Sequence, residues 1–120
     1  MAVYDQLPVF KQTYDLLLKL FNLSSHFSRD IRYTLGEEIK KEIIGVEKLI
    51  YQANANHDKQ QYIEQARVSL VGIKLQLRIL FDLKQITVNQ YASCVEMAES
   101  ISKQLAAWAA YQKRKKKDKK

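Results

Sequence analysis

The chain has 120 residues, of which 47% are hydrophobic, three are Gly and one is Pro. This length and composition fit a single domain and exclude most multi-domain enzymes. The net charge is +7, but residues 113–120 contain seven basic residues and one acidic residue and so carry +6 of it. The other 112 residues carry only +1, so the body of the protein is not expected to bind polyanions over its whole surface.

The single cysteine, Cys94, cannot form a disulfide within the chain and lies in an apolar pattern typical of a helix core. We therefore expect a reducing compartment and assign the protein to the cytoplasm. Residues 1–10 contain no basic stretch followed by an apolar run, and no segment reaches the roughly 18 apolar residues of a membrane span. The sequence predicts neither a signal peptide nor a membrane protein.

Apolar residues recur at spacings of three and four and turn-forming residues are rare, so the sequence predicts four helices and no strand. The first helix covers residues 7–23 and has Pro8 in its first turn, where a missing N–H costs nothing. Its expected core face consists of Phe10, Tyr14, Leu17, Leu18 and Phe21. The second helix begins after a short connection at Ser28, a favoured N-cap residue. Its expected core row consists of Leu35, Ile39, Ile43, Val46, Ile50 and Ala53.

Two capping patterns predict where the third and fourth helices begin. Asp58 with Gln61, and Thr87 with Gln90, have the spacing of a capping box. The core row of the third helix is expected to be Ile63, Ala66, Leu70, Ile73, Leu77 and Leu80. That of the fourth is expected to be Tyr91, Cys94, Val95, Ala98, Ile101, Leu105 and Trp108.

Short connections force neighbouring helices to run in opposite directions. The sequence therefore predicts an antiparallel up-down-up-down four-helix bundle in residues 1–112, followed by a basic, disordered segment in residues 113–120. The third helix also carries a second apolar row, which consists of Val68, Val71, Leu75 and Ile79. This row has two interpretations: the third helix is the most buried of the four, or the row forms a subunit interface.

No spacing of residues indicates catalysis. His26 and His57 fall in predicted loops, and two histidines with one core cysteine are too few for a zinc site. The nearby acids Glu37, Glu38 and Glu42 alternate with lysines, as on an ordinary solvated helix face, and no Gly-rich phosphate loop is present. We expect no enzyme activity, metal, cofactor or small-molecule substrate.

Two basic features are candidate binding sites. The first, here called the basic segment, consists of Lys113, Arg114, Lys115, Lys116, Lys117, Lys119 and Lys120. It can follow a nucleic-acid backbone, or it is a solubilising segment. The second, here called the basic row, consists of Arg67, Lys74 and Arg78, which return to nearly the same helix angle over about 16 Å. It contacts phosphates or a protein partner, or it is a solvated face in which Arg78 pairs with Asp82.

Base stacking on aromatic side chains is not expected, because Tyr14, Tyr91 and Trp108 fall on predicted core positions.

Three stretches of the chain resemble the accessory variability determinant proteins of diversity-generating retroelements. They are Phe-Ser-Arg-Asp-Ile-Arg-Tyr-Thr-Leu-Gly at 27–36, Leu-Gln-Leu-Arg-Ile-Leu-Phe-Asp-Leu at 75–83 with Ile-Thr-Val-Asn-Gln-Tyr at 86–91, and the late Trp108. The matching motif residues are Arg32, Leu35, Gly36, Arg78, Asp82, Gln90, Tyr91 and Trp108, for which the resemblance implies structural roles. Ser28 and Ala106-Ala107 depart from the family pattern, which often has Pro and Gly-Gly there.

The resemblance implies a homopentameric barrel of four-helix bundles that binds reverse transcriptase and template RNA or DNA and has no chemistry of its own. In that role the protein supports mutagenic reverse transcription and the diversification of a target gene. Two alternatives remain at this point: an RNA-associated protein similar to those encoded in intervening sequences of ribosomal RNA, and a helical interaction module that binds no nucleic acid.

Overall fold

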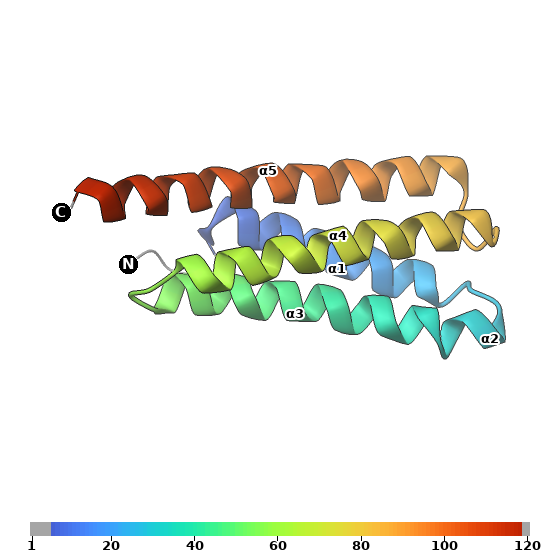
Figure 1. Ribbon diagram of the computed structural model, residues 1–120. Helices are drawn as coiled ribbons and strands as arrows, with labels where there is room; N and C mark the ends of the chain where they lie inside the picture. Colours follow the sequence, from blue (N-terminus) through green and yellow to red (C-terminus); the bar gives the residue numbers. More distant parts are fainter. Residues whose placement is uncertain (1–5, 119–120) are drawn as a thin grey trace.

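The structure, a computed structural model, describes residues 6–118, and these residues form helices and no strand. The four long helices are α1 (Pro8–Ser24), α3 (Leu35–Ala55), α4 (Gln60–Asp82) and α5 (Val88–Asp118), and the short helix α2 (Arg29–Arg32) lies between α1 and α3. The all-α prediction is confirmed. In Figure 1 each long helix runs in the direction opposite to that of the long helix before it.

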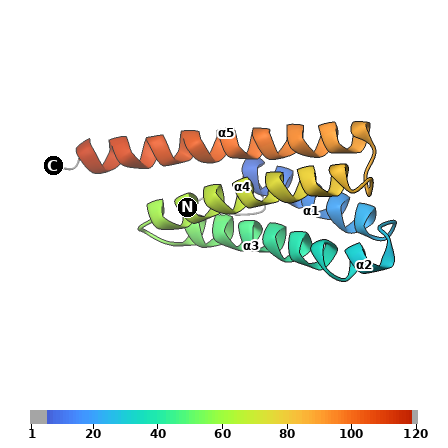
Figure 2. The same cartoon turned by 45° about the vertical axis from the view of Figure 1, so that its right-hand side comes forward.

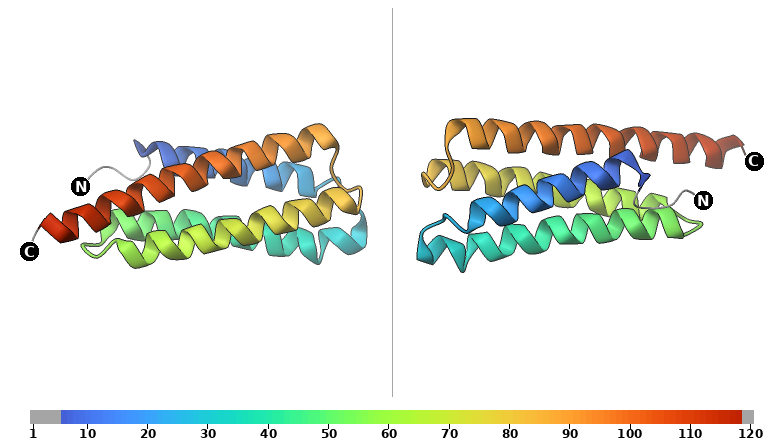
Figure 3. Two further views of the ribbon diagram at one scale, coloured as in Figure 1. Left: turned by 45° about the horizontal axis from the view of Figure 1, so that its top comes forward. Right: turned by 180° about the vertical axis from the view of Figure 1, so that it is seen from behind.

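The helices form a slender bundle whose principal extents are 54 × 21 × 20 Å. Helix α4 packs against α3 and α5, and α1 packs against the same two helices from the other side. Seen from behind in Figure 3, α1 lies in front of the bundle between α5 and α3. Helices α1 and α4 therefore occupy diagonally opposite positions, and their outer faces point away from each other.

The core rows predicted for α3, α4 and α5 are confirmed, because their residues line the centre of the bundle. All six predicted residues of α4 are buried, as are Ile39, Ile43, Val46, Ile50 and Ala53 of α3. In α5, Cys94, Ala98, Ile101 and Leu105 are buried, and Tyr91, Val95 and Trp108 are half-buried against them. Spacings of three and four place these side chains on one strip of each helix.

The core face predicted for α1 is wrong at Tyr14, Leu18 and Phe21, although Phe10 and Leu17 do pack half-buried against the core. The buried residues of this helix are Val9, Thr13, Leu16, Leu20 and Ser24, whereas Tyr14, Leu18 and Phe21 are 48%, 50% and 40% exposed. Two hydroxyls are tolerated inside because each one donates a hydrogen bond within α1, from Thr13 Oγ1 to Val9 O at 2.7 Å and from Ser24 Oγ to Phe21 O at 2.8 Å. The large side chains of Tyr14, Leu18 and Phe21 are left at the surface.

The helix predicted to start at Ser28 is interrupted in the structure. Thr34 has φ −115° and ψ −93°, which end α2 and separate it from α3. The Thr34 hydroxyl donates to Asp30 O at 2.6 Å, which satisfies a carbonyl that the break leaves free. The Ser28 hydroxyl makes no capping bond; instead, the Ser28 N–H donates to Gln85 Oε1 at 2.8 Å and ties the α1–α2 connection to the α4–α5 connection.

One of the two predicted capping boxes exists. At the start of α5, Thr87 N donates to Gln90 Oε1 at 2.8 Å and Gln90 N donates to Thr87 Oγ1 at 3.1 Å. The box predicted from Asp58 and Gln61 is wrong, because α4 has Lys59 at its N-cap and no side-chain cap there. Asp58 pairs with Lys116 instead, at 3.6 Å.

Replacing Thr87 with Ala should lower the free energy of unfolding by about 1 kcal/mol, because the N–H of Gln90 loses its acceptor. Thr87 is exposed, so the change leaves no cavity. Urea unfolding measures the effect, and Thr87→Ser, which keeps the hydroxyl, serves as the control. Equal stability of Thr87→Ala and the unchanged protein would mean that the box does not hold the start of α5.

Candidate nucleic-acid and partner interface

The basic segment continues α5 beyond the end of the core. Ala109 is the last buried residue of α5, and the helix extends through Asp118. In Figures 1 and 2 this end of α5 projects past the turn between α3 and α4. The disorder expected for residues 113–120 is therefore not what the structure has at 113–118, and Lys119 and Lys120 lie outside the described residues.

Helix geometry explains this difference. Lys and Arg have high helix propensity, and cations in a last turn interact favourably with the negative end of the helix dipole. Lys115, Lys116 and Lys117 occupy that turn, and Lys116 gains an ion pair with Asp58. The five basic residues from Lys113 to Lys117 are all exposed, so they present their charge to solvent on a helical scaffold.

Each member of the basic row has an acidic partner. Arg67 Nη1 lies 3.1 Å from Glu64 Oε1, Lys74 Nζ lies 2.7 Å from Glu99 Oε1 and Arg78 Nε lies 3.1 Å from Asp82 Oδ1. The pair of Lys74 and Glu99 joins α4 to α5, and the hydrogen bond from Lys74 lowers the pKa of Glu99. The partner of Arg78 is the one expected for a solvated face. The row therefore carries little uncompensated charge.

The second apolar row is confirmed as exposed, which removes the interpretation that α4 is buried on all sides. Val68, Val71, Leu75 and Ile79 are 72%, 66%, 62% and 37% exposed. A groove of about 480 Å³ between α4 and α5 is lined by Val68, Val71, Arg67 and Lys74, so part of the apolar row borders part of the basic row. Exposed apolar rows with a charged border are typical of protein interfaces.

A further apolar row, which sequence reasoning assigned to the core, lies on α1. Here called the α1 apolar row, it consists of Tyr14, Leu18 and Phe21. The Lys40 ammonium lies 5.1 Å from the centre of the Phe21 ring, so a cation covers one end of the row. Since α1 and α4 are diagonal to each other, the molecule carries exposed apolar rows on two opposite sides.

The family-motif residues near α2 fix a corner of the backbone. Arg32 Nη2 donates to Ser25 O at 2.9 Å, across the connection that follows α1. A Cβ at Gly36 would lie 3.1 Å from Ile31 O and 3.3 Å from the Phe27 ring, so a side chain at this position would crowd the corner. Leu35, the first residue of α3, packs half-buried against the core.

The motif residues at the α4–α5 corner act in the same way. Arg78 hydrogen-bonds to Asp82 and also to Tyr91, and both interactions raise the pKa of the guanidinium. The Tyr91 ring stacks on Phe81 with ring centres 4.9 Å apart, while Gln90 completes the capping box and Trp108 packs half-buried against the core. These residues hold helix ends in place, and none of them presents a reactive group in a cavity.

Sequence reasoning also missed a buried acid on α3. Glu47 is 9% exposed, and neither of its carboxylate oxygens has a hydrogen-bond partner among the described residues. Burial raises the pKa of Glu47 from its ordinary value near 4.5 to about 8. The carboxyl is therefore protonated at neutral pH, because a bare charge at this depth is costly.

Within residues 6–118, no three His, Cys, Asp or Glu side chains come together in a way that could hold a metal ion. None of the described helices is both long enough and apolar enough to cross a membrane. The one cysteine, Cys94, is a buried free thiol whose pKa is raised by that burial.

Comparison with known proteins adds one finding. A protein-family model described as bAvd-like matches residues 8–112, which include α1 to α4 and most of α5. No curated protein matches the sequence.

Replacing Glu47 with Gln should flatten the dependence of stability on pH. The folded protein keeps a proton on Glu47 that the unfolded chain loses above pH 4.5, so stability falls as pH rises from there to about 8. The fall approaches about 1.4 kcal/mol per pH unit, and Glu47→Gln lacks it. Urea unfolding between pH 5 and 8.5 measures both slopes, and Glu96→Gln, which removes an exposed acid, is the control. Parallel slopes for Glu47→Gln and the unchanged protein would contradict the buried acid.

Proposed function

The chain belongs to the bAvd-like family, and on this premise we propose that it is a non-enzymatic accessory factor of a diversity-generating retroelement. It binds reverse transcriptase and template RNA or DNA and so supports mutagenic reverse transcription. The family match carries this proposal because it covers nearly the whole bundle. The match favours this role over a ribosomal intervening-sequence protein and over an interaction module without nucleic acid.

The assembly that we propose is a ring of identical antiparallel up-down-up-down bundles. Two different apolar rows on opposite sides of one chain suit a head-to-tail contact, in which the second apolar row of α4 packs on the α1 apolar row of the next copy. Such contacts close into a ring when the rotation between copies permits it. Five copies is the number that the family resemblance implies, and the compartment that we propose is the cytoplasm.

The basic segment is the element that we propose for nucleic acid. Its cations at positions 113–117 are exposed and helical, and of these only Lys116 has an ion pair within residues 6–118. In a ring, five such helix ends would gather their charge. A polyanion that displaces counterions from them gains affinity without base recognition, which suits a factor that handles different templates.

The basic row and the groove beside it are proposed to contact reverse transcriptase. Cations that are already paired with acids, and that lie next to exposed apolar side chains, are typical of protein interfaces rather than of phosphate-binding surfaces. The charges then contribute orientation and specificity, since exposed ion pairs are worth little affinity.

Replacing Leu75 with Glu should dissociate the oligomer while each chain stays folded, because Leu75 is 62% exposed in the single chain. Losing one buried leucine costs about 1.5–3 kcal/mol, or at least about a tenfold weaker contact between subunits. Multi-angle light scattering reports the mass and circular dichroism reports the helix content.

The matched control for this variant is Val88→Glu, which adds the same charge at an apolar position that is also 62% exposed but lies outside both rows. A monomeric unchanged protein at every concentration, or a Leu75→Glu variant that assembles normally, would contradict the proposed ring.

Deleting residues 113–120 should weaken the binding of single-stranded RNA and flatten its dependence on salt. If about five cations contact phosphates, the logarithm of affinity falls with the logarithm of salt concentration with a slope near −3.5, and the deletion removes most of that slope. Fluorescence anisotropy at several salt concentrations measures it. The comparison is with Arg67→Glu, Lys74→Glu and Arg78→Glu combined, which should impair capture of reverse transcriptase more than it impairs RNA binding.

Two results would count against these assignments. RNA affinity that does not change on deletion would remove the basic segment from the mechanism. Normal capture of reverse transcriptase by the triple variant would make the basic row an ordinary solvated face.

A further inference from the structure

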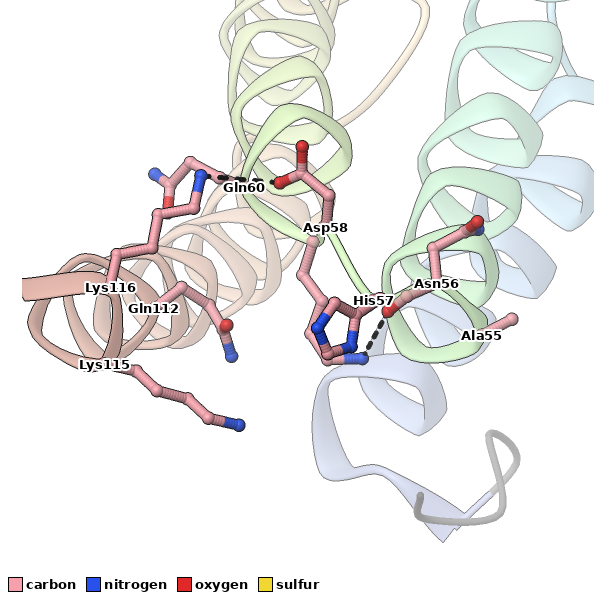
Figure 4. Close-up of a pocket in the computed structure, with 9 residues that line it drawn as sticks. Ala55, Asn56, His57, Asp58, Gln60, Gln112, Lys115 and Lys116 are labelled. Atoms are coloured by element: carbon pink, nitrogen blue, oxygen red, sulfur yellow. Dashed lines mark hydrogen bonds and ion pairs between the residues drawn. The ribbon is translucent and has the colours of Figure 1, made fainter. Parts of the chain in front are cut away.

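A cavity of about 680 Å³ lies where the end of α5 passes over the turn between α3 and α4 (Figure 4). Residues 55–60, which include the turn and the helix ends on either side of it, form one wall, and Gln112, Lys115 and Lys116 of α5 form the other. In Figure 4 the side chains of Gln112 and Lys115 extend from α5 toward His57. Polar groups from two segments that are distant in sequence therefore face one space.

The first cation at this cavity is fixed by the end of α3. Lys59 Nζ donates hydrogen bonds to Ala53 O at 2.9 Å, to Asn54 O at 3.1 Å and to Asn56 O at 2.9 Å. These three bonds use all three of its N–H groups. Lys59 therefore gives the cavity a positive charge that does not move, but it has no N–H left for a ligand.

Lys115 and Lys116, the two lysines of α5 at the cavity, differ in whether they have an acidic partner. Lys116 lies 3.6 Å from the Asp58 carboxylate, which is the acid at the wall of the cavity. No described residue forms a hydrogen bond or ion pair with Lys115. The N–H groups of the Lys115 ammonium therefore remain available to a ligand.

Lys59 and Lys115 repel each other across this space. Burial is the first cause that lowers the pKa of Lys59, and the charge of Lys115 is the second. With Asp58 already shared by Lys116, the cavity has two lysine charges that no carboxylate balances. An anion between them would relieve the repulsion.

We propose that this cavity binds a phosphate group, either free or carried by a polynucleotide. Phosphate oxygens accept hydrogen bonds from several directions, and the donors here come from both walls: the Lys115 ammonium and the Gln112 amide from α5, and the His57 imidazole from the turn. Lys59, which lines the cavity on the side of the turn, adds its fixed positive charge. The polynucleotide form of the ligand rests on the proposed function, whereas the binding of free phosphate does not.

Binding of inorganic phosphate to the full chain tests the site directly. Calorimetric titration at constant ionic strength should show saturable binding, and Lys115→Gln should weaken it at least about tenfold, since it removes a charge-assisted hydrogen bond. Lys41→Gln is the control, because Lys41 is an exposed lysine of α3 that neither lines the cavity nor belongs to the basic segment. Asp58→Asn should tighten binding by removing the competing carboxylate and freeing Lys116.

Two results would overturn the proposal. One is the absence of saturable phosphate binding to the unchanged protein. The other is an equal affinity of Lys115→Gln and Lys41→Gln for phosphate.

A second measurement separates the sources of the phosphate group. Oligonucleotides with a 5′-phosphate and with a 5′-hydroxyl are compared for binding to the unchanged protein and to Lys115→Gln, with inorganic phosphate as competitor. Preference for the 5′-phosphate that Lys115→Gln abolishes supports a strand terminus as the ligand. Phosphate binding without any oligonucleotide binding supports the site but contradicts the proposed nucleic-acid function. Oligonucleotide binding without phosphate binding contradicts the site and leaves that function intact.

Discussion

The apolar seam that runs through all four long helices is the constraint on which the rest of the structure depends. Each helix contributes side chains that are almost wholly buried, among them Leu16, Ile43, Leu70 and Ile101. Because the seam takes only one strip of each helix, the apolar residues beyond that strip remain at the surface. The two exposed rows on α4 and α1 follow from this excess, and the proposed contact between copies of the chain depends on them.

The core of α3, α4 and α5 could be predicted because these helices each have one dominant apolar strip. In α1 the apolar residues occupy more than one strip, so periodicity alone could not choose between them. The choice depends on Thr13 and Ser24, whose hydroxyls bond to carbonyls of their own helix and so become cheap to bury. The break at Thr34 was missed for a related reason, since a local hydroxyl bond replaces a helical one there.

The candidate sites could be predicted in position but not in electrostatic state. The basic row follows from helical spacing, yet the partner of Lys74 is Glu99 on a neighbouring helix, which only tertiary packing brings close. The cavity at the α3–α4 turn could not be predicted from local patterns either, because its walls come from residues more than 50 positions apart. No local pattern identifies Glu47 as a buried acid. The shift of its pKa depends on the side chains that surround it in three dimensions.

The length of α5 links the seam to the proposed binding of anions. Helix α5 has 31 residues and α4 has 23, and the seam ends at Ala109, so the last turns of α5 project from the bundle without a core of their own. Within the described residues, helical hydrogen bonds, the helix dipole and the weak pair of Lys116 with Asp58 oppose the repulsion among the lysines there. An anion bound beside Lys115 reduces that repulsion and stabilises the same turns. Ligand binding and helix formation are therefore coupled at this end. The buried seam fixes the position of α5 and so the position of the cations that contact the ligand.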